Sequence, residues 1–334
     1  MTQCIKNSRR NALTFFSLAV MTAFASFVSS APAQAQDEVT RIIVPYKGGG
    51  PIDITTRILA EAMKESLGTI VVESKPGGGA NIGMKYVADS KPDGYTLGIA
   101  STPTHGVNVW LYSRMPFDPD NDFTPISQMV KVPNVLVMKK ETAERLHIKT
   151  VGDLIEYGKK NLGKLNYGSG GNGSGGHLAG ALFDVRTGIK AMHIPFNGSN
   201  PAEVALLGGQ VDFSFDNLAT AAANIKAGLT VPLAVTTLDR SGFLPDVPTM
   251  DSVLPGFEIY TWWGVVGPAG LSGDSVMKLN KAVMSALHST AVKTKFASIF
   301  AEPIASSPED FRKFMASERS KYKEIVKLSG ARAD

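Results

Sequence analysis

The sequence predicts an α/β protein built from two doubly wound units, each a sheet with flanking helices. Three glycine-rich turns, at residues 45–53, 168–177 and 195–201, each lie between a strand-like apolar run and a helix-like run. Strands and helices that alternate in this way form parallel sheets. Glycine lets a ligand approach the backbone closely, and the helix start behind each turn offers unpaired amide N–H groups. Such turns are therefore candidate sites for anions.

The first unit begins with an apolar strand at 41–44. Asp53 is expected to be the N-cap of a helix that ends near 67, where Gly68 stops it. A strand at 70–73 leads to a second glycine turn at 76–80, with Asn81 as the N-cap of a helix to about 88. The turn at 92–94 precedes another strand at 95–100.

The second unit opens with a capping box at Thr150 and Asp153, which predicts a helix to about 161. The following pattern predicts strands at 164–167, 191–194 and 211–215, and helices at 177–186, 201–207 and 218–227. Two amphipathic helices, at 275–288 and 308–328, complete the chain. Their apolar faces need a sheet to cover, so we expect this tail to return to the first unit.

Residues 1–35 have the pattern of a cleaved secretory signal peptide. Lys6, Arg9 and Arg10 precede an apolar core at 12–28, and a small-x-small cleavage site lies at 33–35. The apolar run contains four hydroxyl residues, which disfavours a membrane anchor. The arginine pair resembles a twin-arginine signal, but Ala12 stands where that pattern has an aromatic residue, so ordinary Sec export also fits.

Composition excludes several classes of protein for the mature chain. Cys4, the one cysteine, lies in the leader, so no disulfide, zinc-thiolate site or thiol nucleophile is expected after cleavage. Removal of the leader takes three of the 34 basic residues and none of the 30 acidic ones, which leaves a net charge of +1. We therefore expect no nucleic-acid partner.

Cofactor and metal motifs also receive little support. Residues 168–173 satisfy the G-x-G-x-x-G pattern of a dinucleotide site, but the next strand ends in Pro195 and Phe196, without the acidic residue that would hold a ribose. No glycine turn ends in Gly-Lys-Ser/Thr, which excludes a P-loop, and the five histidines lack metal-ligand spacing. We expect no cofactor and no metal, and His177 is interpreted as a residue of the first turn of a helix.

Seven motifs together identify a family. The chain resembles the Bug-type solute-binding receptors of tripartite tricarboxylate transporters in VPY at 44–46 with GGGP at 48–51 and Asp53, PGGGANIG at 76–83, PDGYTL at 92–97, GS at 173–174 with HLA at 177–179, LGGQVD at 207–212, Arg240 with LPDVPT at 244–249, and GPAG at 267–270. Each motif is weak alone, but the set stands in family order from about residue 40 to the C terminus.

The resemblance implies a periplasmic, two-lobe binding protein of the type II-like, Venus-flytrap architecture. The chain would cross between lobes near Val137 and Tyr260, so that 36–137 plus 261–334 form lobe 1 and 138–260 form lobe 2. The resemblance further implies an organic-acid ligand in the cleft, a membrane permease of a tripartite transporter as partner, no enzymatic activity and a monomer. A carboxylate suits helix N-termini beyond the carboxyl ends of strands.

Carried over position by position, the resemblance implies ligand contacts from both lobes. Lobe 1 would supply Tyr46, Gly49, Gly50, Asp53, Ser101, Thr102 and His105; lobe 2 would supply Gly170, Asn172, Gly173, Ser174, Phe196, Gly198, Ser199 and Asp216. Two acids have a second interpretation. Asp53 is favoured as a helix cap that shapes the anion turn. Asp216 is an alternative cap for the helix that follows it, and acceptance from a ligand hydroxyl or ammonium group is its less favoured interpretation.

The first turn departs from the family pattern, which usually has Pro-Ala where Lys47 and Gly48 stand and often Thr where Ile52 stands. Lys47 is either an ion-pair partner for a second carboxylate or a solvated side chain on the rim. Tyr46, Phe196, Trp262 and Trp263 suit an aromatic acid or, more commonly, serve packing. The ligand class thus stays open among dicarboxylates or tricarboxylates, acidic amino acids and aromatic acids.

Two other functions compete with transport. An exported hydrolase would use Ser174, which lies three residues before His177, although no G-x-S-x-G elbow and no orienting third residue accompany it. A ligand carrier for a membrane sensor kinase would have the same cleft as a transport receptor, so the sequence does not separate the two.

Overall fold

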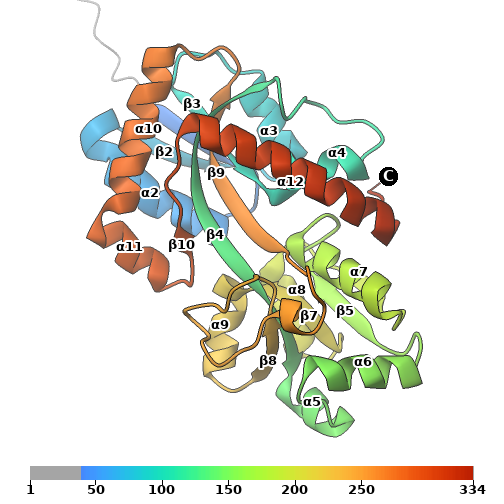
Figure 1. Ribbon diagram of the computed structural model, residues 1–334. Coiled ribbons are helices and arrows are strands. Elements are labelled where there is room, and N and C mark those ends of the chain that lie inside the picture. Colours follow the sequence, from blue (N-terminus) through green and yellow to red (C-terminus); the bar gives the residue numbers. More distant parts are fainter. Residues whose placement is uncertain (1–38, 334) are drawn as a thin grey trace, which may run out of the picture. The chain divides into compact units, whose positions relative to one another are not determined.

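The structure is a computed structural model, which describes residues 39–333; the predicted signal peptide lies outside these residues. They form a mixed α/β body whose strands follow one hydrogen-bonded path, β2-β1-β3-β9-β4-β7-β5-β6, with β8 and β10 paired to β4 (Figure 1). Within residues 39–333, none of the helices combines the length and apolar character needed to cross a membrane.

The first group of strands is parallel at its edge and antiparallel at its centre. β1 (Thr40–Val44) pairs in parallel with β2 (Ile70–Ser74) on one side and β3 (Thr96–Ser101) on the other. β9 (Tyr260–Pro268) then runs antiparallel to β3. The helices α2 (Pro51–Leu67) and α3 (Asn81–Ala88) connect these strands, as the alternating pattern predicts.

β4 (Phe123–Lys139) belongs to both groups of strands (Figure 1). Its residues 123–133 pair with β9, and its residues 134–139 pair with β7 (Phe213–Asn217) and β8 (Thr230–Val235). The change of partner falls at Pro133, which has no N–H to give to a ladder. The sequence placed this crossing near Val137, and the lobe boundaries themselves stay predictions.

The second group of strands adds β5 (Asn166–Ser169), which pairs in parallel with β7 and with β6 (Met192–Pro195). Its connecting helices are α7 (Gly175–Thr187), α8 (Ser199–Leu207) and α9 (Leu218–Lys226). The shorter α5 (Lys140–Leu146) and α6 (Val151–Lys160) precede β5, and Thr150 and Asp153 form the predicted capping box. A 3₁₀ turn at Met250–Ser252 precedes β9.

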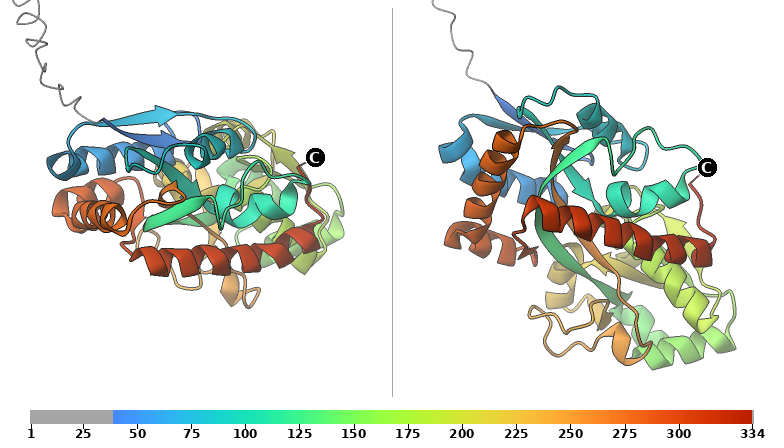
Figure 2. Two further views of the ribbon diagram at one scale, coloured as in Figure 1. Left: turned by 90° about the horizontal axis from the view of Figure 1, so that it is seen from above. Right: turned by 45° about the horizontal axis from the view of Figure 1, so that its top comes forward.

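The tail covers the first group of strands, as expected. α10 (Gly273–His288) and α11 (Thr290–Ala297) pack against α2, and the short β10 (Glu302–Pro303) pairs with β4. α12 (Pro308–Ser329) packs on β4, on the π-helical turn η1 (Thr102–Val107) with the following α4 (Asn108–Leu111), and on α7 (Figure 2). It therefore contacts β4, which belongs to both groups of strands, and the helix α7 of the second group.

The two tryptophans of β9 show how the sheet is covered. Trp262 and Trp263 are at most 1% exposed and point to opposite faces, as neighbours on a strand must. The Trp262 ring packs against two phenylalanines of α12 and donates to Glu318, whereas Trp263 donates to Thr55 of α2. The packing interpretation of these residues is confirmed.

Two predicted helix caps are wrong. α2 begins at Pro51 with Gly50 as its N-cap, so Asp53 is the third helical residue rather than the cap. Proline suits the first helical position because its missing N–H would be unpaired there anyway. The N-cap of α3 is Ala80, in a left-handed conformation (φ 76°), which leaves Asn81 as the first helical residue.

A pair of glycine substitutions tests the packing of α12 on the sheet. In a Gly264→Ala variant the new methyl group would meet Phe311 Cζ at 2.4 Å and the Ser127 carbonyl oxygen at 2.7 Å, so the sheet or α12 must move. We expect a loss of about 1–3 kcal/mol in the free energy of unfolding, measured by urea denaturation. Gly273→Ala, in open space at the start of α10, is the matched control and should be neutral or slightly stabilising. Equal stability of the two variants would contradict this packing.

Candidate functional site

The carboxyl ends of the parallel strands in both groups point toward the same stretch of β4. In the first group, Ser101 at the end of β3 pairs with Trp263, which pairs with Val130. In the second group, Asn217 at the end of β7 pairs with Asn134. Four residues of a strand span about 13 Å, so the two sets of strand ends face each other across this short segment. Open α/β sheets bind ligands beyond such ends.

The turn after β1 has open space beside its glycines and leaves backbone amides of α2 without a partner in the described part of the chain. Gly49 has φ 86°, a conformation that favours glycine, and a Cβ added at Gly49 or Gly50 would have no heavy atom within 4 Å. Gly50 is the N-cap of α2 and supplies no side-chain cap. Pro51 has no amide N–H, so the amides of α2 that are open to an external acceptor are those of Ile52 and Asp53. Lys47 beside them is exposed, and its ammonium takes part in no ion pair with residues 39–333.

Asp53 organises this turn from inside α2. Its Oδ2 accepts a hydrogen bond from the Gly49 amide at 2.9 Å, and both carboxylate oxygens accept from Arg57 Nε at 3.0 Å. Burial alone would raise the pKa of Asp53, but the bonds from Arg57 and Gly49, with the Arg57 charge, hold it below its ordinary value. Asp53 is therefore an ionised residue that fixes the shape of the turn.

The residues that follow β3 are largely enclosed. Ser101 Oγ lies 2.8 Å from the hydroxyl of the half-buried Tyr46, and Thr102 Oγ1 accepts from the Trp262 amide at 3.0 Å. His105 is fully buried, its ring lies against Phe123, and burial together with the charge of Arg319 lowers its pKa to about 3. Tyr46 is therefore the residue of this cluster that is partly exposed, whereas Ser101, Thr102 and His105 are buried.

The turn after β5 contains glycines that are explained by packing. A Cβ at Gly173 would meet Leu111 Cδ1 at 2.5 Å, so this turn lies against α4. Ser174 is the N-cap of α7, and its Oγ accepts from the His177 amide at 3.2 Å. Asn172 is exposed and Gly170 is half-buried.

His177 is in the first turn of its helix, as predicted. Its Nδ1 accepts from the Gly173 amide at 3.0 Å, and its ring stacks on His193 with centroids 4.1 Å apart. Burial lowers its pKa to about 4. This ring is therefore neutral and is not hydrogen-bonded to the Ser174 hydroxyl, which removes the geometry of a serine–histidine pair. No group of three or more metal-ligating side chains gathers within residues 39–333.

The turn after β6 repeats the arrangement at α2. Gly198, with φ 114°, is the N-cap of α8 and supplies no side-chain cap. The Gly198 amide donates to the Gly170 carbonyl at 3.2 Å, and the Ser199 amide lies 3.2 Å from the place of a Cβ on Gly170, so the turns after β5 and β6 lie together. Phe196 is half-buried beside them.

Asp216 is the last predicted site residue. It belongs to β7, and the N-cap of α9 is Asn217, whose Oδ1 accepts from the Ala219 amide at 3.0 Å. The interpretation of Asp216 as a cap is therefore wrong. Asp216 is 4% exposed, its Oδ1 accepts from the Asn217 amide at 2.8 Å, and its carboxyl group interacts with the Ser199 side chain through a hydrogen bond.

Sequence reasoning missed Asn134, which lies where β4 changes partners. Its Oδ1 accepts from Thr261 Oγ1 at 3.0 Å, and its buried Nδ2 finds no acceptor within residues 39–333. Gly175 leaves room for it, since a Cβ there would come within 2.7 Å of this nitrogen. An asparagine inside a long strand carries no motif, and its place depends on the crossing.

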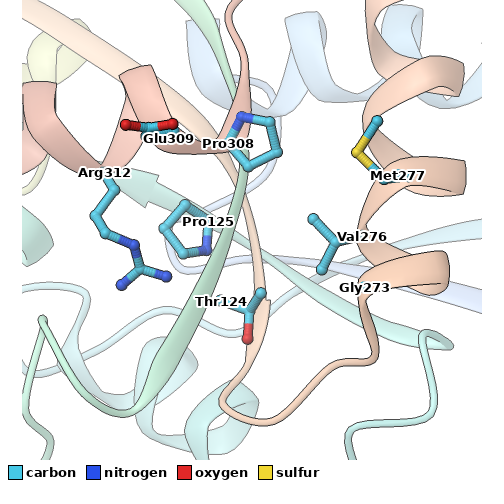
Figure 3. A pocket seen from close by; sticks show the side chains of 8 residues that line it. All are labelled: Thr124, Pro125, Gly273, Val276, Met277, Pro308, Glu309 and Arg312. Atoms are coloured by element: carbon cyan, nitrogen blue, oxygen red, sulfur yellow. The ribbon is translucent and has the colours of Figure 1, made fainter.

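A surface hollow of about 500 Å³ lies elsewhere (Figure 3). It is lined by the start of β4, by α10 and by the start of α12: Thr124, Pro125, Gly273, Val276, Met277, Pro308, Glu309 and Arg312. Thr124 pairs with Gly267, at the end of β9 opposite to the one that faces the strand ends above. This hollow is therefore separate from the candidate site.

The chain has relatives of known family. A model of the tripartite tricarboxylate transporter family receptor (TctC) matches residues 55–331. Protein BugT of Bordetella pertussis is 34% identical over 309 residues, which cover 91% of this chain and 94% of BugT. The similarity to this family therefore covers nearly the whole chain and is not confined to the motifs.

Solved structures share the fold. Rpa4515 of R. palustris with adipate is 34% identical, with a TM-score of 0.82 over 87% of this chain and 97% of that one. The periplasmic binding protein BugD has 32% identity and a TM-score of 0.79 (88% and 98% covered). MatC of Rhodopseudomonas palustris with bound malate is 30% identical, with a TM-score of 0.78 over 86% of this chain and 98% of that one.

These matches confirm the two-lobe α/β fold and the resemblance seen in the motifs. The chain belongs to the Bug-type solute-binding receptors of the tripartite tricarboxylate transporter family.

Proposed function

We propose that this protein is a non-catalytic periplasmic receptor that captures an organic acid between its lobes and delivers it to the permease of a tripartite transporter. The relatives that hold adipate and malate support a dicarboxylate as the ligand class. The pattern of residues 1–35 supports export by a cleaved signal peptide. Membership of a transporter receptor family supports delivery to a permease.

The observation that carries this proposal is the pair of uncapped helices at the site. α6, α7, α9, α10, α11 and α12 each begin with a Ser, Thr or Asn whose side-chain oxygen accepts a backbone N–H. α2 and α8, which follow the turns at the facing strand ends, have Gly50 and Gly198 as N-caps and no such side-chain bond. α3, α4 and α5 also lack a side-chain cap, but α3 gives its first two amides to carbonyls of the preceding glycine turn, α4 continues from η1, and α5 follows the far end of β4. The open amides and positive dipole ends of α2 and α8 are left for an anion.

The proposed contacts divide by their exposure. Backbone amides at Gly50 and Gly170, with the hydroxyl or amide groups of Tyr46, Asn172 and Ser199, would bind the first carboxylate. Gly49 and Gly198 would leave space for it, because their own amides already donate to Asp53 and to the Gly170 carbonyl. Asp53, Ser101, Thr102, His105, Gly173 and Ser174 would act by shaping the turns, because their side chains or Cβ positions are already engaged within the protein. Charge-assisted bonds of this kind are worth roughly 1.5–3 kcal/mol each.

A thermal-shift screen tests the ligand class. We expect aliphatic dicarboxylates such as adipate and malate to raise the melting temperature selectively, because ligand at about 100 times its dissociation constant adds roughly 2.7 kcal/mol. The comparison set is tricarboxylates, acidic amino acids, aromatic acids and uncharged diols of equal length. Native mass spectrometry of the untreated protein shows whether the site is already filled. An empty protein that responds to no acid would refute the receptor proposal.

Gly50→Ala tests whether the start of α2 receives the ligand. Gly50 has φ −85° and ψ 172°, which any residue adopts, and its Cβ position is open, so the fold should be unaffected. The added methyl group would stand at the open amides, and we expect at least a tenfold loss of affinity by calorimetry. Gly242→Ala is the matched control, exposed and equally unobstructed. Equal affinity in the two variants would place the ligand elsewhere.

Lys47→Ala tests the second charge. If Lys47 pairs with the distal carboxylate, its removal should weaken dicarboxylates more than monocarboxylates of the same length, and added salt should reduce the difference. Lys91→Ala, on the turn between α3 and β3, serves as the control for net charge. Equal losses for monocarboxylates and dicarboxylates would assign Lys47 to the solvated rim.

A further inference from the structure

Asp216 has the features of a carboxyl group built to be neutral. It is 4% exposed, and its Oδ2 has no hydrogen-bond partner within residues 39–333. Its known contacts are the Asn217 amide, which donates to Oδ1 at 2.8 Å, and the Ser199 side chain. A buried polar atom without a partner is uncommon in a folded protein and costs stability.

The two buried acids of the site differ in their partners. Asp53 in lobe 1 is as buried, at 5% exposed, but it has Arg57 and the Gly49 amide. Asp216 has no cation in contact; the charged group that acts on it is the Glu203 carboxyl of α8, which is bonded to Asn224 Nδ2 at 2.6 Å. Burial and the Glu203 charge raise the pKa of Asp216 well above its ordinary value.

The other elements around β7 do not supply a compensating charge. Within α9 the charged side chain is Lys226, which is exposed, β5 carries no charged residue, and β4 places Val135 opposite Asp216. α7 packs against β7 with Gly176 beside the Phe215 carbonyl, and the histidine of its first turn, His177, is neutral because burial lowers its pKa to about 4. An ionised Asp216 would thus be an unpaired buried charge, which proteins avoid by neutralising the group.

The carboxyl group of Asp216 lies at the start of α8, where its proton could be donated to a ligand. Asp216 is one residue before the N-cap of α9, and its contact Ser199 is the first residue of the uncapped helix α8. A carboxylate drawn to the amides of α8 would be repelled by an ionised Asp216. A protonated Asp216 has an O–H group that needs an acceptor, and its Oδ2 has none in the protein.

We propose that Asp216 is a neutral acid whose Oδ2–H donates to a carboxylate oxygen of the ligand at the start of α8, which makes it a specificity residue for unaminated organic acids. The proposal rests on the proposed function. An ammonium group at this end of the ligand would instead require an ionised Asp216, so α-amino acids are disfavoured. The ligand carboxylate binds only to the form of the protein in which Asp216 is protonated. The affinity for the ligand therefore falls as pH rises through the pKa of Asp216 in the folded protein.

The first experiment needs no ligand. Infrared difference spectra of the wild type minus Asp216→Asn at neutral pH should contain a protonated carboxyl band, because a carboxylic acid absorbs at higher frequency than a carboxylate. The matched control is Asp53→Asn, whose difference spectrum should contain a carboxylate band. A carboxylate band for Asp216 would overturn the proposal.

Stability supplies an independent readout. A folded-state pKa raised above the unfolded value makes a stabilising contribution that is present at low pH and is lost as pH rises through the folded-state pKa. The stability of Asp216→Asn relative to the wild type should therefore increase with pH. A difference that is independent of pH would overturn the neutral acid.

The second experiment measures the affinity for adipate and malate by calorimetry from about pH 6 to about pH 9. The wild type should lose about tenfold per pH unit above the pKa of Asp216, which is the linkage of one proton. Asp216→Asn keeps a donor in the same place, so it should bind with a flat pH profile, whereas Asp216→Ala should bind weakly.

The alternative outcomes are distinct. Loss of affinity in Asp216→Asn with tight binding of glutamate to the wild type would show an ionised acceptor and overturn the proposal. If the wild type binds no acid at any pH, the proposed function and the donation to a ligand both fail, and the infrared result still decides the state of Asp216.

Discussion

The structure depends on the strand β4, which pairs with strands of both groups. β4 pairs with β9 up to Pro133 and with β7 and β8 from Asn134 onward, so the carboxyl ends of both sets of parallel strands are brought to one short segment. Thr236 ties the two crossing strands together. Its amide donates to the Asn134 carbonyl at 2.9 Å, its carbonyl accepts from the Ile259 amide at 3.0 Å, and its buried hydroxyl donates to the Ile259 carbonyl. The spacing of the facing turns is set by these backbone bonds.

The two sides of the site each contain a buried acidic residue next to a turn that is proposed to bind an anion, and the two acids differ in their partners. In lobe 1 a buried carboxylate is balanced by Arg57 and is used to hold the turn, so that Gly49 and Gly50 leave their surroundings empty. In lobe 2 the buried acid has no such partner, and the turn is held by the neutral His177 through the Gly173 amide. The charge that Asp53 brings to the first turn of α2 is balanced by Arg57, and the neutral His177 brings no charge to the turn it holds, so neither arrangement leaves an uncompensated negative charge to repel an anion.

Local signals in the sequence were sufficient for most elements but not for the crossing. Gly68 ends α2, Thr150 and Asp153 cap α6, and the strands that border the glycine turns were predicted to within about two residues, because each signal acts through near neighbours. β4, β8 and β9 were not predicted, since their pairing joins residues that are 75 or more positions apart in the sequence. The wrong cap at Asp53 has a similar origin: Pro51 already fixes the first turn, and the carboxylate bonds back to Gly49 from the third helical position.

The glycines show most clearly why a motif does not assign its own chemistry. Gly49, Gly50 and Gly173 all come from family motifs that suggest close approach of a ligand. The surroundings of Gly49 and Gly50 are empty, whereas the place of a Cβ on Gly173 is filled by Leu111, and that on Gly176 by the Phe215 carbonyl. The first pair keeps space for something outside the protein, and the second pair permits elements of the protein itself to meet. Only the contacts at each position separate these roles, and they direct the search for the ligand to the uncapped starts of α2 and α8.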